Sequence, residues 1–249
     1  MAYGSVAENA TIRVKNLTSQ PYIRLTLDIM RYFGVEVFEN RMEEFRFGIR
    51  QSYMPRKYTV EGDWSGAAFL LVAAALNGEI ELTGLNMESA QSDIAILDGL
   101  RSAGAKVKRL KNGVKVEKDQ LEAFSFDATQ CPDLFPPLVA LAAGCDGVSR
   151  IEGAERLTHK ESDRGTALKQ EFGKLGIKIE VERDLMRIYG GTGVKGGKVH
   201  SHYDHRIAMA CAVAATIAEA PIEIEDADAV NKSYPEFWEH WEKLGGKLS

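Results

Sequence analysis

The stretch Leu175-Gly176-Ile177 joins a predicted helix to a predicted strand, and the same join recurs along the chain. An apolar residue followed by glycine is found again at Gly34, Gly104 and Gly245, and successive glycines of this set lie 70, 72 and 69 residues apart. Glycine is favoured directly after a helix because it adopts positive φ without steric strain. The spacing therefore predicts a repeated module of a helix, a glycine and two strands.

Short runs of strand-forming residues lie on both sides of these helices. Hairpins are predicted for 35–38 with 45–49, 106–110 with 114–117, and 178–182 with 186–189. Further strands are predicted at 11–14, 79–83, 149–152 and 222–225. Together with the helices they predict an α+β fold of repeated β-α-β-α-β-β units, about three of them between Tyr58 and Ser249.

Two series of helices alternate along the chain. The helices predicted at 64–76, 134–143 and 205–218 are apolar on almost every side, whereas those at 92–103 and 162–175 are amphipathic. A helix that is apolar all round belongs in the middle of a domain, and its small residues allow close packing. We therefore expect buried central helices with sheets outside them.

The repeat is incomplete towards both ends of the chain. Residues 11–50 look like the second half of a unit, and the last unit stops at Ser249 without a complete hairpin. A complete domain seldom leaves strand edges unpaired, so we expect a piece of a longer repeat protein. The predicted domains are residues 1–58, the remnant of one domain, and residues 59–249, a second domain of three repeats. The unpaired strands also predict self-association with another copy of the chain.

The composition argues against several classes of protein. The chain has 249 residues, 45% of them hydrophobic, and a formal net charge of −5, which argues against a broad nucleic-acid-binding surface but is compatible with a small cationic cleft. The apolar runs are too short to cross a membrane, and the N-terminal segment does not resemble a signal peptide. Three widely spaced cysteines fit neither a zinc ribbon nor a disulfide framework. These features predict a cytoplasmic protein.

Charged residues gather in the loops that precede equivalent helices, and in a repeat protein such loops tend to share one face. The stretch Lys160-Glu161-Ser162-Asp163-Arg164 places four ionisable side chains at one loop-to-helix junction. Further loops carry His205 with Arg206, Lys232, and Asp133. Because helix N-termini favour anions, this mixture suits a phosphorylated substrate and proton transfer.

Structural roles also explain some of these residues. One aspartate precedes each apolar helix: Asp63, Asp133 and Asp204. N-capping accounts for all three without any catalysis, and Ser162 or Asp163 can likewise cap the helix that follows them. His200, His202 and His205 would suggest a metal site, but neither a fourth ligand nor an acidic loop is evident, and no metal is predicted.

Several short motifs are distinctive and occur in a fixed order. They are Ser19-Gln20-Pro21-Tyr22-Ile23, Val60-Glu61-Gly62-Asp63-Trp64-Ser65, Lys160-Glu161-Ser162-Asp163-Arg164, Asp204-His205-Arg206-Ile207-Ala208-Met209 and Lys232-Ser233-Tyr234-Pro235. In this combination the chain resembles the 5-enolpyruvylshikimate-3-phosphate synthases (EPSP synthases), also called 3-phosphoshikimate 1-carboxyvinyltransferases, over residues 11–245. The resemblance implies a fold of two domains with three units each, in which residues 1–58 belong to the domain that binds shikimate phosphate.

The resemblance also implies a reaction. Members of this family transfer the enolpyruvyl group of phosphoenolpyruvate to the 5-hydroxyl of shikimate 3-phosphate and release phosphate, a step of the shikimate pathway to aromatic amino acids. The reaction would use no metal and no organic cofactor. The partners would be these two small molecules, with neither nucleic acid nor a membrane.

Roles for single residues follow from the matching motifs. The catalytic residues would be Asp133, Glu161, Lys232 and His205. The substrate-binding residues would be Ser19, Tyr22, Lys160, Arg164 and Arg206. Asp133 would accept the proton of the substrate hydroxyl, while Glu161 and Lys232 would serve proton transfer at the enolpyruvyl carbon.

The same resemblance divides the binding contacts between the two substrates. Ser19 and Tyr22 would contact shikimate phosphate, and Lys160 would contact the shikimate hydroxyls. Phosphoenolpyruvate would be surrounded by the remaining cationic and imidazole side chains: Arg164, Arg206, His205 and Lys232.

The chain also departs from the family pattern. The family's chains are longer towards the N-terminus, where they carry a lysine and arginines for phosphoenolpyruvate and a Ser-Ser-Gln segment for the substrate phosphate. We therefore expect this chain to be a truncated, weakly active or inactive piece. Trp64 replaces a small residue and Tyr203 stands where asparagine is common, which puts the local contacts there in question.

Two other functions stay open on the sequence alone. The enolpyruvyl transferases that act on UDP-N-acetylglucosamine share the repeat architecture, although the Lys-Glu-Ser-Asp-Arg and Asp-His-Arg runs argue against them. The other alternative is a non-catalytic fragment that binds an anion.

Overall fold

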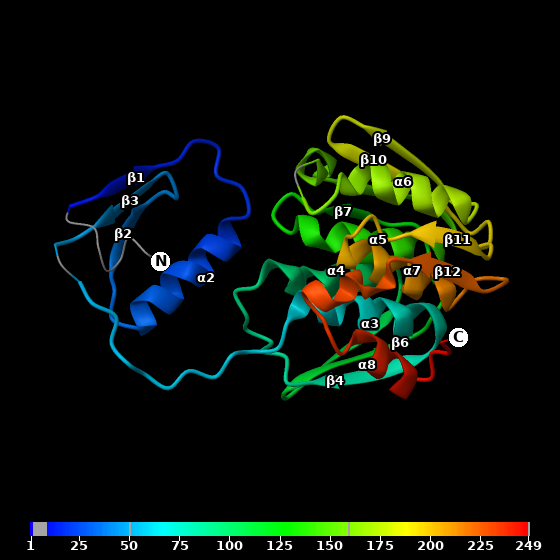
Figure 1. Cartoon of the computed structure of the whole chain (residues 1–249), viewed down its shortest axis with the longest axis horizontal. Helices are drawn as coiled ribbons and strands as arrows, with labels where there is room; N and C mark the ends of the chain where they lie inside the picture. Colours follow the sequence, from blue (N-terminus) through cyan, green and yellow to red (C-terminus); the bar gives the residue numbers. More distant parts are fainter. Residues whose placement is uncertain (2–8, 50, 159, 249) are drawn as a thin grey trace. The chain divides into compact units, whose positions relative to one another are not determined.

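The computed structural model describes residues 1, 9–49, 51–158 and 160–248, which divide into two compact units (Figure 1). The first unit consists of Met1–Glu61 with Glu88–Ser92, and the second of Gly62–Met87 with Asp93–Ser249. The interpretation of residues 1–58 as a domain remnant and of residues 59–249 as a three-repeat domain stays a prediction.

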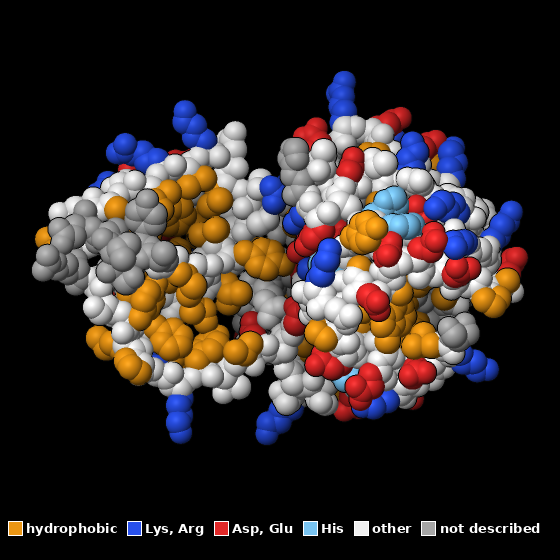
Figure 2. Space-filling view, viewed as in Figure 1, with side chains coloured by type: hydrophobic (Ala, Val, Ile, Leu, Met, Phe, Trp, Pro, Cys, Tyr) orange, Lys and Arg blue, Asp and Glu red, His pale blue; other side chains and the backbone are white. Residues whose placement is uncertain are grey.

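The first unit packs one helix on a small sheet. Its elements are β1 (Thr11–Arg13), α2 (Gln20–Tyr32), β2 (Val37–Asn40) and β3 (Glu44–Phe47). The strands pair antiparallel in the order β1-β3-β2, which confirms the predicted hairpin. The core is small and consists of Met30, Val35, Met42, Phe45 and Phe47. Hydrophobic side chains also lie on the visible surface of this unit in Figure 2.

Three apolar helices form the centre of the second unit. They are α3 (Trp64–Asn77), α5 (Phe135–Ala143) and α7 (His205–Ala215), and each packs against the other two. All nine residues of α5 are buried, as expected of a helix without a polar side. The prediction of buried central helices is confirmed.

Small sheets lie around these helices. The strands are β4 (Glu79–Thr83), β5 (Lys106–Leu110), β6 (Gly113–Glu117), β7 (Ser125–Asp127), β8 (Gly147–Glu152), β9 (Lys178–Glu182), β10 (Leu185–Gly190), β11 (Gly197–His200) and β12 (Ile222–Glu225). They pair in the orders β4-β6-β5, β7-β8-β10-β9 and β11-β12. The β5–β6 and β9–β10 hairpins lie where the sequence predicts them, while β7–β8 and β11–β12 pair in parallel.

The remaining helices are shorter or amphipathic. They are η1 (Ser92–Ala95) with α4 (Ile96–Ser102), α6 (Arg164–Lys174), α8 (Phe237–Lys243), and the 3-10 segments η2 (Pro132–Leu134), η3 (Ala154–Leu157) and η4 (Ala227–Lys232). Within the described ranges, none of the helices has both the length and the apolar character that crossing a membrane requires.

The repeated glycines have the predicted backbone conformation. Gly34, Gly104, Gly176 and Gly245 have φ of 90°, 96°, 86° and 97°. Gly104 is the most constrained, since a Cβ atom there would lie 2.6 Å from the carbonyl oxygen of Gln120. These glycines end helices and start the strands or loops that follow, as the spacing predicts.

The predicted units are wrong in one respect. The β-α-β-α-β-β order is seen from β7 to β10, but among the described residues no strand lies between β3 and α3. Val60, in that place, is 81% exposed. A strand needs a neighbour for its backbone hydrogen bonds, and the strand-forming residues there do not have one in the sheets described above.

Candidate active site

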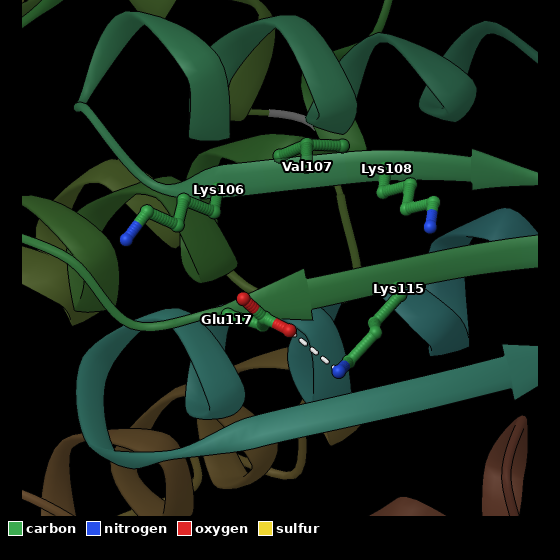
Figure 3. Close-up of a pocket in the computed structure, with 5 residues that line it drawn as sticks. All are labelled: Lys106, Val107, Lys108, Lys115 and Glu117. Carbon is green, nitrogen blue, oxygen red and sulfur yellow. Dashed lines mark ion pairs between the residues drawn. The ribbon is translucent and has the colours of Figure 1, made fainter.

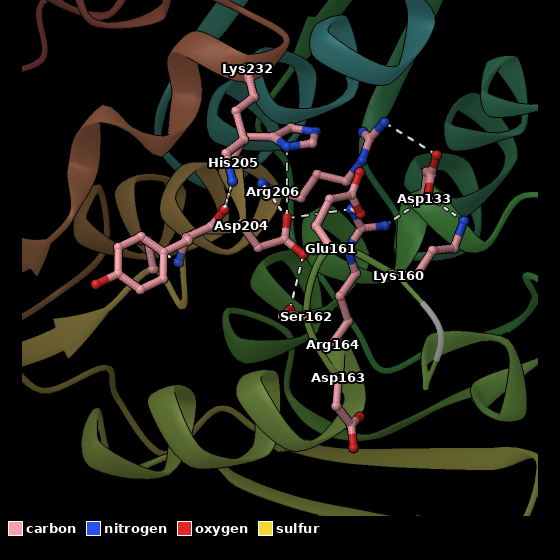
Figure 4. Close-up of polar contacts among 12 residues, drawn as sticks. Asp133, Lys160, Glu161, Ser162, Asp163, Arg164, Asp204, His205, Arg206 and Lys232 are labelled. Atoms are coloured by element: carbon pink, nitrogen blue, oxygen red, sulfur yellow. Dashed lines mark hydrogen bonds and ion pairs between the residues drawn. The ribbon is translucent and has the colours of Figure 1, made fainter.

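Two helices of the second unit begin at aspartate caps beside a cluster of polar side chains; Asp204 belongs to the cluster, whereas the carboxylate of Asp163 points away from it (Figure 4). Asp163 caps α6, since its carboxylate accepts from the backbone and the hydroxyl of Thr166 at 3.2 and 2.9 Å. Asp204 caps α7 and accepts from the backbone of Arg206 at 3.0 Å. The positive end of the α7 dipole therefore lies at this cluster, and α6 contributes the side chain of its first residue, Arg164.

Asp133 does not cap a helix, although it shares the repeat position of Asp63 and Asp204. The residue in the N-cap position of α5 is Leu134, because Pro132 begins the short η2 turn ahead of the helix. The carboxylate of Asp133 instead binds three cations: Lys160 at 3.0 Å, Arg164 at 2.7 Å and Arg206 at 3.2 Å. Capping by Asp63 and Asp204 is confirmed, and the same prediction for Asp133 is wrong.

Arg164 links the carboxylates from the inside of the cluster. Its side chain is fully buried and donates through Nε to Asp204 and through Nη1 to Asp133, at 2.7 Å in each case. Its Nη2 pairs with Glu161, and the Ser162 hydroxyl donates to Asp204 at 3.0 Å. A buried guanidinium requires such partners because an unpaired buried charge is strongly unfavourable. Arg164 thus binds carboxylates of the protein, and its contact with substrate stays a prediction.

The cluster carries an excess of positive charge. Its cations are Lys160, Arg164, Arg206 and Lys232. Its carboxylates are Asp133, Glu161 and Asp204. The ammonium group of Lys232 donates to the backbone carbonyl of Tyr203 at 2.6 Å, which is an uncharged partner. With the α7 dipole added, the excess charge favours binding of an anion.

Asp133 is ionised in these surroundings. Burial alone would raise the pKa of its carboxyl group, but the charges of Arg206, Lys160 and Arg164 outweigh burial and lower the pKa to about 2. At neutral pH the group is therefore a carboxylate held by three cations.

His205 is buried beside the cluster with unsatisfied ring nitrogens. Its side chain is 6% exposed, and Asp204 Oδ1 lies 3.9 Å from Nδ1, which is too far for a hydrogen bond. Among the described residues, neither ring nitrogen has a hydrogen-bond partner, and the same holds for Nε of Arg206. Burial, and then the charge of Arg206, lower the pKa of the imidazole, so the neutral form prevails at neutral pH. Buried polar atoms are rarely left unsatisfied, and a bound ligand would supply the partners.

Comparison with known proteins assigns the chain to a family. A family model described as EPSP synthase (3-phosphoshikimate 1-carboxyvinyltransferase) matches residues 1–241. The chain belongs to the EPSP synthase family. Two proteins named 3-phosphoshikimate 1-carboxyvinyltransferase, from Clostridium botulinum (strain Eklund 17B / Type B) and Clostridium novyi (strain NT), are 40% and 39% identical to it over 243 and 239 residues. The matches cover 97% and 96% of this chain and 56% and 55% of the relatives, so the chain spans about half their length.

A solved structure supports the EPSP synthase fold. The EPSP synthase from Acinetobacter baumannii matches with a TM-score of 0.83 and 23% identity, covering 99% of this chain and 59% of that chain. The predicted α+β fold of the EPSP synthase type is confirmed. At this identity the likeness concerns the fold and not the chemistry.

The structure explains one departure from the EPSP synthase motifs. Tyr203 has φ of 55°, and His202 before it has φ of 53°. Asparagine tolerates this left-handed region better than bulky residues do, which agrees with the expectation that asparagine is common at this position. The sequence did not identify Tyr203 as the partner of Lys232, because a contact with a backbone carbonyl does not depend on the residue type. Because the contact uses the backbone carbonyl, tyrosine can keep it.

The other family motifs contribute residues to both units. Ser19 and Tyr22 belong to the first unit, where Ser19 occupies the N-cap position of α2 and its carbonyl accepts from the Tyr22 amide at 3.1 Å. Their contacts with shikimate phosphate stay predictions. Trp64, the second departure, is fully buried in the core of the second unit, and its indole donates to the carbonyl of Asn86 at 3.1 Å.

A hollow on the outer β4-β6-β5 sheet is a weaker candidate for a binding site. It has a volume of about 350 Å³ and is lined by Lys106, Val107, Lys108, Lys115 and Glu117 (Figure 3). Lys115 binds Glu117 at 2.5 Å and Glu79 at 3.0 Å. Two carboxylates of the protein thus already balance the charge of this lysine.

Two of the three histidines that would suggest a metal are bound to carboxylates. His200 contacts Asp226 and His202 contacts Glu171, both at 2.8 Å. In the part of the chain that the structure describes, no group of three or more His, Cys, Asp and Glu side chains is arranged to hold a metal ion.

Proposed function

We propose that the cation cluster binds phosphoenolpyruvate and that the chain takes part in transferring the enolpyruvyl group to the 5-hydroxyl of shikimate 3-phosphate, with release of phosphate. The proposal is carried by the buried imidazole of His205, which lacks a hydrogen-bond partner among the described residues beside a cluster with excess positive charge. The names of the Clostridium relatives support the same reaction.

Phosphoenolpyruvate fits the donors of the cluster because it carries both a carboxylate and a phosphate group. Arg206 and Lys232 pair with these anionic groups in the proposed complex. Their present partners are few: Arg206 donates to Asp133 at 3.2 Å, and Lys232 donates to a backbone carbonyl. The neutral imidazole of His205 hydrogen-bonds to the same ligand. Arg164 contributes its positive charge to the binding of the anion. Its Nε, Nη1 and Nη2 atoms already donate to carboxylates of the protein.

Asp133 accepts the proton of the 5-hydroxyl in this mechanism, and Glu161 with Lys232 moves a proton at the enolpyruvyl carbon. A carboxylate with a pKa of about 2 is a weak base. When Arg206 turns to phosphoenolpyruvate and Lys160 to the shikimate hydroxyls, Asp133 loses two of its three cations. The pKa of Asp133 then rises towards the range in which the group accepts a proton.

The other parts of the proposal rest on the family motifs. Ser19 and Tyr22 of the first unit contact shikimate phosphate, and the reaction uses no metal or organic cofactor. A cytoplasmic location and self-association through unpaired strands also stay predictions.

A phosphate-release assay tests the proposed function. Phosphate should form only when phosphoenolpyruvate and shikimate 3-phosphate are both present, and Asp133→Asn should lower the rate about 100-fold or more. Asp63→Asn is the matched control, because Asp63 occupies the same repeat position and asparagine caps helices as well as aspartate does. This control should keep the wild-type rate. The turnover number of the wild-type chain in this assay tests the expectation from the sequence that the chain is only weakly active or inactive.

The acceptor separates the alternative functions. Phosphate release with UDP-N-acetylglucosamine in place of shikimate 3-phosphate would indicate the other transferase. Binding of phosphoenolpyruvate without release of its phosphate in the presence of either acceptor would indicate an anion-binding protein without catalysis. A folded protein that binds no phosphoenolpyruvate would contradict the proposal.

A further inference from the structure

A buried carboxylate outside the cation cluster contacts the loop that leads into it. Glu171 lies on α6, is fully buried, and accepts from the backbone of His200 at 2.9 Å and from Lys174 at 2.6 Å. Its other oxygen contacts the ring of His202 at 2.8 Å. Burial alone would raise the pKa of Glu171, but the bonds from Lys174, His202 and the His200 amide hold it below its ordinary value. The mechanism proposed above gives this ionised group no part.

The loop that Glu171 contacts has an unfavourable backbone. His202 and Tyr203 are consecutive residues in the left-handed region, at φ of 53° and 55°. Such a conformation persists in bulky residues only where surrounding contacts hold it. The His202 amide donates to Nδ1 of His200 at 2.7 Å, and the Tyr203 amide donates to the hydroxyl of Ser201 at 3.1 Å. Glu171 adds the contacts with His200 and His202, and so ties this loop to α6.

The same loop holds a cation of the candidate site. The carbonyl of Tyr203 accepts from Lys232 Nζ at 2.6 Å, and the next residue, Asp204, pairs with Arg164 at 2.7 Å. Arg164 and Glu171 both belong to α6 and are seven residues apart, about two helical turns, so they lie on one side of the helix. One helix thus holds both ends of the segment that presents the Tyr203 carbonyl.

We propose that Glu171 is a positioning residue for Lys232: by holding the His200–Tyr203 loop it presents the Tyr203 carbonyl to the lysine and places the ammonium group for the anion. The placement of Lys232 follows from the contacts above, whereas its effect on phosphoenolpyruvate rests on the proposed function. Two kinds of measurement therefore test the proposal, one without a ligand and one with it.

Three variants separate positioning from a general loss of structure. Glu171→Gln removes the charge that holds the loop. His202→Asn is a second route that leaves the core intact, because asparagine tolerates the left-handed backbone but is too short to reach Glu171. Lys174→Gln is the matched control, since it removes another partner of the same carboxylate and leaves both loop contacts in place.

The ligand-free measurement follows acetylation of Lys232 by mass spectrometry, together with hydrogen exchange of amides 201–206. Glu171→Gln and His202→Asn should raise the acetylation rate of Lys232 about two- to tenfold, the equivalent of one lost hydrogen bond, and should speed exchange in the loop. Lys174→Gln should change neither. Unchanged Lys232 reactivity in folded His202→Asn protein would overturn the proposal, even if Glu171→Gln fails to fold.

The measurement with ligand is a double-mutant cycle on affinity for phosphoenolpyruvate. Glu171→Gln should weaken binding about tenfold in the wild-type background and much less in the Lys232→Ala background, because its effect passes through that lysine. Equal weakening in both backgrounds would mean that Glu171 is merely structural. If wild type binds no phosphoenolpyruvate but Lys232 reactivity changes as expected, the proposed function fails and the positioning role stands.

Discussion

Asp133 is the residue on which the candidate site depends most. Its carboxylate joins Lys160, Arg164 and Arg206, which lie 27, 31 and 73 residues away in the sequence. Because these cations lower the pKa of Asp133 to about 2, its ionised form is favoured by folding. Loss of that charge should lower the free energy of unfolding.

The pH dependence of unfolding tests this point. With a folded pKa of about 2 and an unfolded pKa of about 3.9, ionised Asp133 contributes about 2–3 kcal/mol above about pH 5. That contribution is lost as pH falls towards the folded pKa, and about half is gone near pH 3. Urea unfolding should therefore show a smaller loss of stability between about pH 5 and pH 3 in Asp133→Asn than in wild type. Parallel plots of unfolding free energy against pH for the two proteins would contradict the lowered pKa of Asp133.

The sequence predicted which charged residues gather, but not how they pair. Asp133 occupies the repeat position of a capping aspartate, and nothing local distinguishes it from Asp63. Its bond to Arg164 at 2.7 Å depends on the tertiary fold, which brings a distant helix to it. The unsatisfied nitrogens of His205 likewise result from packing and cannot be read from the motif.

At the scale of elements, the glycine positions define where helices end. Gly104→Ala should destabilise the protein by about 2 kcal/mol or more, because alanine is strained at φ of 96° and its Cβ would lie 2.6 Å from a backbone oxygen. Gly173→Ala is the matched control within α6, where an added Cβ meets nothing within 4 Å. This control should stabilise the protein by up to about 1 kcal/mol, since alanine favours a helix. Denaturant unfolding measures both changes.

A Gly104→Ala variant that is as stable as wild type, or more stable, would contradict this account.

Helices and hairpins were predictable because each follows from local periodicity and from a glycine at a fixed distance. The strand expected before α3 was not formed, although Val60 and its neighbours favour strands. A strand depends on a partner far away in sequence, which local propensity does not report.

At the scale of the whole molecule, the two units differ in the size of their cores. The core of the first unit contains five buried side chains, whereas a single large cluster joins α3, α5 and α7 in the second. We therefore expect amides of α2 and β3 to exchange with solvent through openings of lower free energy than amides of α5. Hydrogen exchange followed by mass spectrometry on the intact chain checks this. Equal protection of both units would show that they unfold as one.

Self-association is a further prediction at this scale. Phe38 on β2 is 62% exposed and Ile49 is 68% exposed, and exposed apolar surface of this kind favours association. Sedimentation equilibrium should show species larger than a monomer as the concentration rises. A monomer at high micromolar concentration would contradict the prediction.

The account centres on one claim, that the cluster around Asp133 and His205 binds the anion phosphoenolpyruvate. Calorimetric titration of the intact chain tests it most directly, with inorganic phosphate as a competitor. Wild type should bind phosphoenolpyruvate with a Kd of about 1 mM or below, and Arg206→Ala should weaken binding about tenfold or more. Arg187→Ala, which removes an arginine paired with Glu182 on the β9–β10 hairpin, should bind as wild type does. Equal affinity in the Arg206 and Arg187 variants, or no binding by folded wild type, would contradict the claim.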